Sequence, residues 1–108
     1  MTLLQKRDEA RRERRLSAWL ETRAKLRSVL NGLIPGERVV IFGSLTKPGL
    51  FHDCSDVDLA MVKKPLGVSW GCLMAELENR LCKQVDLILL SECRFREKIE
   101  REGEVWIC

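Results

Sequence analysis

The fold of this chain is decided by the stretch IFGSLTKPGLFHDCSDVDLAMV, residues 41–62, where a Gly-Ser pair follows one apolar run and two aspartates open the next. The first run, Arg38 to Phe42, is rich in β-branched and aromatic residues and ends at Gly43, which predicts a short buried strand. A polar loop containing Pro48-Gly49 leads to a second predicted strand, Val57 to Val62. The stretch therefore predicts two strands joined by a polar loop.

The aspartates at the start of the second strand lie on one face of the predicted sheet. Side chains alternate along a strand, so Asp56 and Asp58 project to the side opposite Val57 and the apolar residues that continue its pattern. A third carboxylate, Asp86, stands in the otherwise apolar run Gln84 to Leu90, which predicts another strand. A single charge in the middle of such a run needs a reason.

Three carboxylates on neighbouring strands would repel one another unless cations share them. Residues two apart on a strand lie about 6.6 Å apart and neighbouring strands about 4.8 Å apart, so Asp56, Asp58 and Asp86 are expected to form a compact acidic triangle. Hard carboxylate oxygens suit Mg²⁺, and two ions about 4 Å apart fit between them. Each aspartate alone is more ordinarily a turn, capping or strand-end residue. All three together favour a site for two magnesium ions.

The Gly-Ser pair is the candidate phosphate seat. A glycine at the end of a buried strand lets the backbone approach a ligand closely, and Ser44 can offer an amide and a hydroxyl to a phosphate oxygen. Taken alone, Gly43-Ser44 is a plain strand-terminating turn, and it gains weight only from the aspartates downstream. Lys47, Lys63 and Lys64 are further phosphate contacts on charge alone, and we do not include them in the predicted site.

A long basic helix is predicted before the first strand. From Thr2 to Leu30 the chain has no Pro or Gly, and Asn31-Gly32 supplies a left-handed stop. Residues 1–27 hold nine Lys or Arg and four Asp or Glu, so they carry more positive charge than the chain's net +3, and the rest is slightly acidic. Apolar residues recur near the helical period only in the second half, which predicts that this half packs and the first half projects or frays: Leu16, Trp19, Leu20, Leu26, Leu30 and Leu33.

Two further helices and a closing segment complete the predicted domain. Ser69 can cap a helix that runs to about Lys83, and Ser91 can cap a last helix that ends at Gly103. Residues 105–107 then form either a short edge strand or a packed tail. The order helix, strand, strand, helix, strand, helix predicts an α/β domain with a small mixed sheet flanked by helices.

Composition indicates one globular domain of ordinary character. The chain has 108 residues, of which 45% are hydrophobic and 32% charged. Its five cysteines form no CxxC pair for zinc or redox chemistry, and we expect them to be small buried hydrophobes. No apolar run approaches the length of a membrane span and no signal sequence is recognisable, so we expect a cytoplasmic protein without membrane contact.

Together, the motifs resemble the minimal nucleotidyltransferases, small members of the polymerase-beta-like nucleotidyltransferase superfamily that are often antitoxins paired with HEPN-domain toxins. Gly43-Ser44, eleven further residues and Asp56-Val57-Asp58 look like the family's Gly-Ser and Asp-x-Asp motifs, with a spacer one residue longer than usual. The family's third carboxylate falls on Asp86 in QVDLIL, and KIEREGEVWI looks like its C-terminal segment. The resemblance implies a single domain with a nucleotidyltransferase core at 37–107 and a basic helical extension at 1–32.

The resemblance also implies an activity: magnesium-dependent transfer of AMP from ATP to a hydroxyl group. In the family pairs the acceptor is a tyrosine of an RNase toxin, which AMPylation neutralises, so a hetero-oligomer with a HEPN-domain toxin is expected. Carried over to this chain, the resemblance makes Asp56 and Asp58 ligands of two magnesium ions and Asp86 a ligand of one ion that also aligns or deprotonates the attacking hydroxyl. These three residues would be catalytic, and Gly43 and Ser44 would bind the β- and γ-phosphates of the nucleotide.

Two alternatives stay open from the sequence. The chain can instead be a non-catalytic antitoxin that neutralises its toxin by complex formation; the intact aspartates favour the enzyme, and the longer spacer mildly favours the binder. The N-terminal helix carries arginines that can contact RNA or an acidic protein surface, but charge-rich helix faces are commonly just solvated, and no aromatic residue stands among these arginines. We favour a solvated face or a protein contact and expect no nucleic acid.

Overall fold

The computed structural model describes residues 2–108 and shows a four-stranded mixed sheet with helices on both faces. The elements follow in the order α1 (Leu3–Leu33), β1 (Arg38–Phe42), the 3-10 turn η1 (Gly43–Thr46), β2 (Val57–Met61), α2 (Trp70–Leu81), β3 (Val85–Leu89), the 3-10 turn η2 (Leu90–Glu92), α3 (Arg96–Glu102) and β4 (Glu104–Ile107). The strand order is β3-β2-β1-β4, with β2 and β3 parallel and the other pairs antiparallel. This confirms the predicted α/β fold class.

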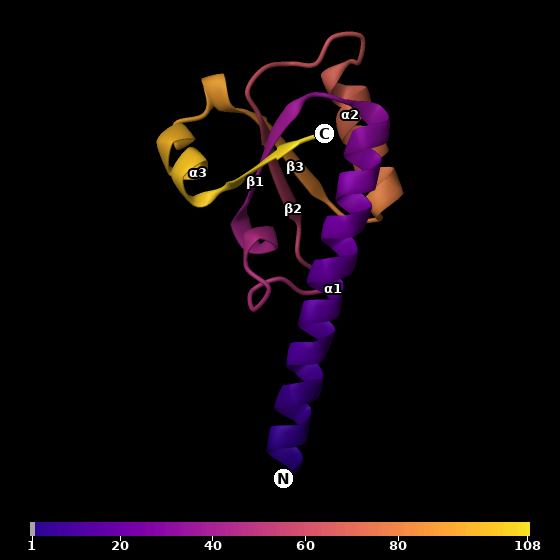
Figure 1. Cartoon of the computed structure of the whole chain (residues 1–108), viewed down its shortest axis with the longest axis vertical. Coiled ribbons are helices and arrows are strands. Elements are labelled where there is room, and N and C mark those ends of the chain that lie inside the picture. The colour runs from indigo at the N-terminus through magenta and orange to yellow at the C-terminus, as the bar shows by residue number, and fades with distance from the viewer. Residues whose placement is uncertain (1) are drawn as a thin grey trace.

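The two faces of the sheet are covered unequally. Helices α1 and α2 lie on one side of the sheet and the short α3 on the other (Figure 1). Apolar side chains from α1, α2 and alternate strand positions form the main core, which includes Leu26, Ile41, Leu59, Leu73 and Leu77. The α3 face holds a smaller cluster, Val40, Ala60, Leu90 and Ile99. Because α3 has only seven residues, it leaves much of this face of the sheet uncovered.

Helix α1 is longer than the sequence indicated. A capping box starts it, since Thr2 and Gln5 each accept a hydrogen bond from the other's backbone N–H. The stop predicted at Asn31-Gly32 is wrong, because the helix runs through Gly32 to Leu33 and the chain turns at Gly36, whose φ is +82°. Packing explains the difference: Leu30 and Ile34 are buried, and that burial outweighs the roughly 1 kcal/mol cost of a helical glycine.

Only the second half of α1 packs against the sheet, as predicted. No residue from 2 to 17 is buried, whereas the stripe Ala18, Thr22, Leu26, Val29 and Leu30 is. The first half projects from the body, and the molecule is 54 Å long as a result (Figure 1). Leu16 and Leu20 were expected in the packed stripe but are about half exposed, because the buried stripe follows Ala18 and Thr22 on another side of the helix.

The remaining boundaries agree with the sequence in part. Ser69 caps α2, as predicted, through a hydrogen bond from the Cys72 backbone N–H. The helix ends at Leu81, two residues before the predicted end near Lys83, and Cys82 follows it with a φ of +54°. Ser91 does not cap the last helix, which begins at Arg96 after the η2 turn. The C-terminal segment is a strand, β4, at the edge of the sheet beside β1.

The cysteines are not the buried hydrophobes that we expected. All five are free; Cys54, Cys72 and Cys82 are exposed, and Cys93 and Cys108 are partly exposed. Burial and the neighbouring Glu37 raise the pKa of the Cys108 thiol, which disfavours its thiolate form. Within residues 2–108, no helix is long and apolar enough to cross a membrane.

Candidate active site

Two of the three predicted carboxylates meet directly on the α3 face of the sheet. Asp58 and Asp86 are partners in the parallel register of β2 and β3, and their side chains are hydrogen-bonded to each other. Asp58 is also opposite Phe42, the last residue of β1. The sheet order places β2 between β1 and β3, so the acid pair lies next to the end of β1, where the Gly-Ser turn begins.

The proximity of the two carboxylates changes the acidity of Asp58. Partial burial, the hydrogen bond with Asp86, the charge of Asp86 and the charge of Asp56 together raise the pKa of Asp58 from 3.8 to about 6. Burial is the largest cause, since it removes the water that would stabilise the ionised form. Near neutral pH the pair therefore holds a second negative charge only at an electrostatic cost, which a nearby cation would relieve.

Gly43 is fixed against this pair for a steric reason. Its φ is +75°, a left-handed conformation, and a Cβ added to it would overlap the carboxylate of Asp58. No other residue type fits here without moving Asp58. The turn that Gly43 opens is closed by Thr46, whose hydroxyl donates to the Gly43 carbonyl at 2.7 Å. The glycine thus brings the backbone of the Gly-Ser turn and the Asp58 carboxylate into contact.

Helix α1 is hydrogen-bonded to the Gly-Ser turn. The Trp19 indole Nε1–H and the Arg23 guanidinium both donate to the carbonyl of Leu45, at 2.7 and 3.2 Å, and the Leu45 side chain is fully buried. Arg23 lies over the Trp19 ring, 4.7 Å from its centroid, and forms an ion pair with Glu104 of β4 at 2.6 Å. The packed half of α1 therefore fixes the position of the Gly-Ser turn.

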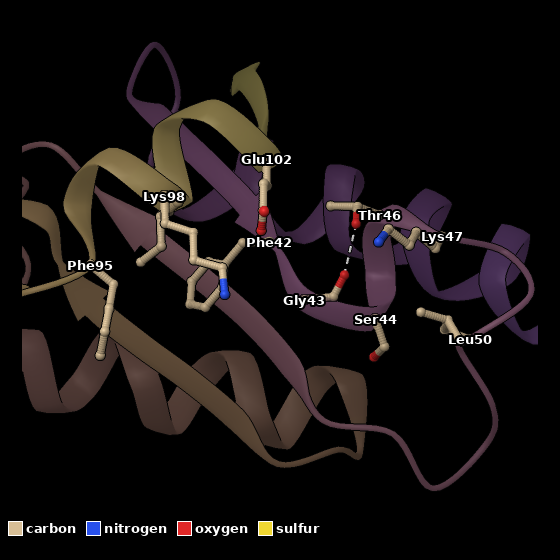
Figure 2. A pocket seen from close by; sticks show the side chains of 10 residues that line it. Phe42, Gly43, Ser44, Thr46, Lys47, Leu50, Phe95, Lys98 and Glu102 are labelled. Carbon is tan, nitrogen blue, oxygen red and sulfur yellow. Dashed lines mark hydrogen bonds between the residues drawn. The ribbon is translucent and has the colours of Figure 1, made fainter.

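A cavity of about 530 Å³ opens beside the turn on the α3 face. Figure 2 shows Ser44, Lys47 and Leu50 at one end of it, Phe95 at the other, and Lys98 and Phe42 between. The full lining is Phe42, Gly43, Ser44, Thr46, Lys47, Leu50, Phe95, Lys98, Ile99 and Glu102. This volume is within the range of small-molecule and cofactor sites.

A second cavity of about 360 Å³ contains the acid pair. Asp58 and Asp86 line it together with apolar residues from β3 and α2. Phe42, Phe95 and Ile99 line both cavities. These three side chains therefore lie between the Gly-Ser turn and the two carboxylates. The two predicted motifs, Gly-Ser and the aspartates, therefore lie in adjoining hollows of one face.

Asp56 is the predicted residue that the structure does not bring into the pair. It precedes Val57, the first paired residue of β2, so no ladder partner places it beside Asp86. Its charge raises the pKa of Asp58 less than burial and Asp86 do. Among residues 2–108, no three carboxylate, imidazole or thiol groups gather closely enough to hold a metal ion. The expected triangle is thus a pair with Asp56 beside it.

The pair nevertheless fits a divalent cation. Asp58 and Asp86 offer hard oxygen donors side by side, and the raised pKa of Asp58 indicates excess negative potential at this point. Mg²⁺ binds in proteins through one or two carboxylates and completes its shell with water and substrate phosphates. Two carboxylates side by side next to the Gly-Ser turn are a donor set of this kind.

The longer spacer between Ser44 and Asp56 is anchored rather than loose. Phe51 at its centre is fully buried, the Lys83 ammonium donates to the Asp53 carbonyl, and the Ser55 hydroxyl accepts from the His52 backbone N–H at 3.0 Å. His52 Nδ1 in turn accepts from the Cys54 backbone N–H at 3.2 Å, which closes a local turn.

Sequence reasoning missed the part of the site that comes from the C-terminal helix. Lys98, Glu102 and Phe95 line the larger cavity, and only the fold brings α3 over the end of β1. Of the three lysines that we weighed on charge alone, Lys47 lines this cavity; Lys64 lines a different hollow, next to Trp70. The sequence holds no local signal for Lys98, because the β1 and η1 residues that it meets in the cavity, such as Ser44, lie more than fifty residues earlier in the chain.

Comparison with known proteins gives one match. A family model described as "Polymerase beta, Nucleotidyltransferase" matches residues 24–108, from the packed half of α1 to the last residue. The matched range includes the Gly-Ser turn and all three aspartates. No curated protein and no solved structure matches the chain.

Proposed function

The chain belongs to the polymerase beta nucleotidyltransferase family, and from this membership we propose that it transfers AMP from ATP to a hydroxyl group of a partner protein. The observation that carries the proposal is the contact between Gly43 and the Asp58 carboxylate. That contact joins a turn suited to phosphate and a carboxylate pair suited to a cation, and nucleotidyl transfer needs both at one phosphorus atom.

The proposed step uses the chain's residues as follows. The Ser44 hydroxyl and the backbone of the turn hold the β- and γ-phosphates, which leaves the α-phosphate over Asp58 and Asp86. The acceptor oxygen bonds to the α-phosphorus, the bond from that phosphorus to the bridging oxygen breaks, and pyrophosphate leaves. Asp86, more exposed than Asp58, takes the proton of the attacking hydroxyl.

A magnesium ion bound by Asp58 and Asp86, with Asp56 in reach as a further ligand, would neutralise charge on the phosphates. The remaining work of the site is positioning, because phosphoryl-type transfers depend mainly on alignment and electrostatic stabilisation. A rigid turn fixed by α1 and a carboxylate pair fixed by strand register supply that alignment.

For the acceptor we propose a tyrosine of a HEPN-domain toxin, which AMPylation would neutralise. The support is the resemblance of the Gly-Ser, Asp-x-Asp and third-aspartate pattern to minimal nucleotidyltransferase antitoxins. The open α3 face is compatible with a protein acceptor, because the carboxylate cavity opens on a side of the sheet that only a seven-residue helix covers.

The test is label transfer from α-³²P-ATP to a co-purified HEPN-domain protein encoded next to this chain, in the presence of magnesium. Wild-type protein should label the toxin on tyrosine, and Asp58→Asn and Asp86→Asn should each abolish labelling while still binding the toxin. Asp8→Asn, on the projecting part of α1, is the matched control and should label normally. Full labelling by Asp58→Asn would refute the proposal, and neutralisation of the toxin without labelling would favour the non-catalytic antitoxin.

A further inference from the structure

Phe95 is the most conspicuous side chain of the α3 face that the proposed function does not use. It is 66% exposed, although it is a large aromatic residue, and it is the N-cap residue of α3. It lines the cavity of the phosphate turn, the cavity of the acid pair and a third hollow beside Trp70. An exposed aromatic ring at the junction of three hollows is well placed to contact a ligand that enters any of them.

The larger cavity changes in character along its length. Its Ser44 and Lys47 end offers a hydroxyl and a cation, whereas Phe95 lies at its other end (Figure 2). Lys98, one turn after Phe95 on α3, adds a second cation between the two ends. A ligand that fits this cavity is therefore anionic at one end and apolar or aromatic at the other.

We infer that Phe95 stacks on the base of the nucleoside triphosphate and that Lys98 contacts its phosphates. The inference rests on the proposed function, which places the triphosphate on the Gly43-Ser44 turn. With the phosphates there, the nucleoside end extends toward the apolar end of the same cavity, where the Phe95 ring is the aromatic surface. Every base has a flat π-face, so a single exposed phenyl ring can bind it without a hydrogen-bond code.

The two lysines of the cavity favour this orientation over the reverse one, because Lys47 lies at the Ser44 end and Lys98 between the two ends (Figure 2). Glu102 is the carboxylate that lines the cavity, and Figure 2 shows its side chain reaching from α3 toward Phe42 and Gly43. No ion pair joins Glu102 to Lys98 in the described chain, so the lysine remains free to contact phosphate.

The experiment separates the nucleoside from the phosphates. Calorimetric titrations of magnesium-ATP and of magnesium-tripolyphosphate, which lacks the nucleoside, are compared for wild type, Phe95→Ala, Phe95→Tyr and Lys98→Gln. Phe95→Ala should weaken ATP binding between about fivefold and a hundredfold and leave tripolyphosphate binding within twofold, the range expected for one base–aromatic stack. Phe95→Tyr keeps the ring and should bind ATP like wild type. Lys98→Gln should weaken both ligands.

The matched control is Leu66→Ala, which also truncates an exposed apolar residue but lies in none of these cavities. It should bind both ligands like wild type. Normal ATP binding by Phe95→Ala would overturn the inference. This holds even if the variant transferred AMP more slowly, because the ring would then contact the acceptor and not the base. Equal weakening of both ligands would overturn it too. Wild-type protein that binds neither ligand would instead refute the proposed function, on which the inference rests.

Discussion

At the scale of single residues, the site depends on the close contact between Gly43 and Asp58, which leaves no room for a side chain at position 43. Gly43 has no side chain, and its backbone lies where a Cβ would overlap the Asp58 carboxylate. The same carboxylate is held by Asp86 across the β2–β3 ladder. Sequence reasoning grouped Gly43, Asp58 and Asp86, and the fold brings these three residues together. The contact between the glycine and Asp58 could not be predicted, because it requires the antiparallel pairing of Phe42 with Asp58.

Gly43→Ala should destabilise the protein by more than about 2 kcal/mol, because a left-handed backbone strains any Cβ and this Cβ also displaces Asp58. Gly36→Ala is the matched control: its φ is +82°, yet open space surrounds the position. It should therefore show only the strain, about 1 kcal/mol. Urea unfolding of both variants measures the difference. Equal losses of unfolding free energy in the two variants would mean that the Asp58 carboxylate does not clash with a Cβ at position 43.

The raised pKa of Asp58 predicts a pH dependence of stability. The folded state holds this proton up to about pH 6 and the unfolded state only to about 3.8, so ionisation favours unfolding as the pH rises through that window. Because the side chain is only partly buried, we discount the full shift for screening and expect a loss on the order of 1–2 kcal/mol by pH 7.5. Asp58→Asn removes the titrating group, so in EDTA its stability relative to wild type should rise by that amount between pH 4 and 7.5.

Urea unfolding at several pH values checks this prediction, with Asp8→Asn as the control whose stability relative to wild type should stay flat. Magnesium should then distinguish wild-type protein from Asp58→Asn. It should raise the melting temperature of wild-type protein at pH 7.5, because a ligand that binds only the folded state stabilises it, and leave Asp58→Asn unchanged. A difference between wild type and Asp58→Asn that does not change with pH would contradict the assignment.

At the scale of elements, α1 and η1 act as one unit. Trp19 and Arg23 on the helix both donate to the Leu45 carbonyl, and Arg23 continues to Glu104 at the edge of the sheet. The turn that presents Ser44 is thereby tied to the helix and to β4. Periodicity predicted that this half of α1 packs, but it could not say against what, since the contact spans more than twenty residues of chain.

Trp19→Phe removes the indole N–H and should cost about 1 kcal/mol of stability, the usual loss for one hydrogen bond when Arg23 still serves the same carbonyl. It should also weaken magnesium-ATP binding, because the turn loses one of its two fixed points. Trp70→Phe is the control, since the Trp70 indole makes no hydrogen bond within residues 2–108. Thermal unfolding and calorimetry of both variants test this. An ATP affinity unchanged in Trp19→Phe would show that the turn holds its shape without the helix.

The limits of sequence reading lie at the same scale. The strands and their alternation were readable because each is a short apolar run bounded by turn residues. The Gly32 stop was misread because local propensity is weak against burial of Leu30 and Ile34. The acid triangle was misread because equal spacing assumes that Asp56 lies on the ladder, whereas pairing begins at Val57. Phe95 and Lys98 were missed because only tertiary packing places α3 beside β1.

At the scale of the whole molecule, the chain forms a packed body from which the first part of α1 projects as an arm (Figure 1). The arm, residues 2–14, carries five basic and three acidic side chains and contributes two units of the net charge of +3. None of its side chains is buried, and its hydrophobic surface is limited to Leu3 and Leu4 near the N-terminal end. The body begins at Arg15, which donates to the Gly49 carbonyl of the spacer loop at 3.4 Å. The matched family range begins later still, at residue 24.

Because the arm buries nothing, removing residues 2–14 should leave the free energy of unfolding within about 0.5 kcal/mol and magnesium-ATP affinity within twofold of the full chain. The helical circular dichroism signal should fall only by the share of the deleted residues. Removing residues 2–22 is the contrasting control: it also deletes Ala18, Trp19 and Thr22, so the turn loses a hydrogen bond and the core loses two buried side chains. That longer deletion should cost at least about 2 kcal/mol. Urea unfolding measures both, and a comparable loss from the short deletion would mean that the arm folds back onto the body in solution.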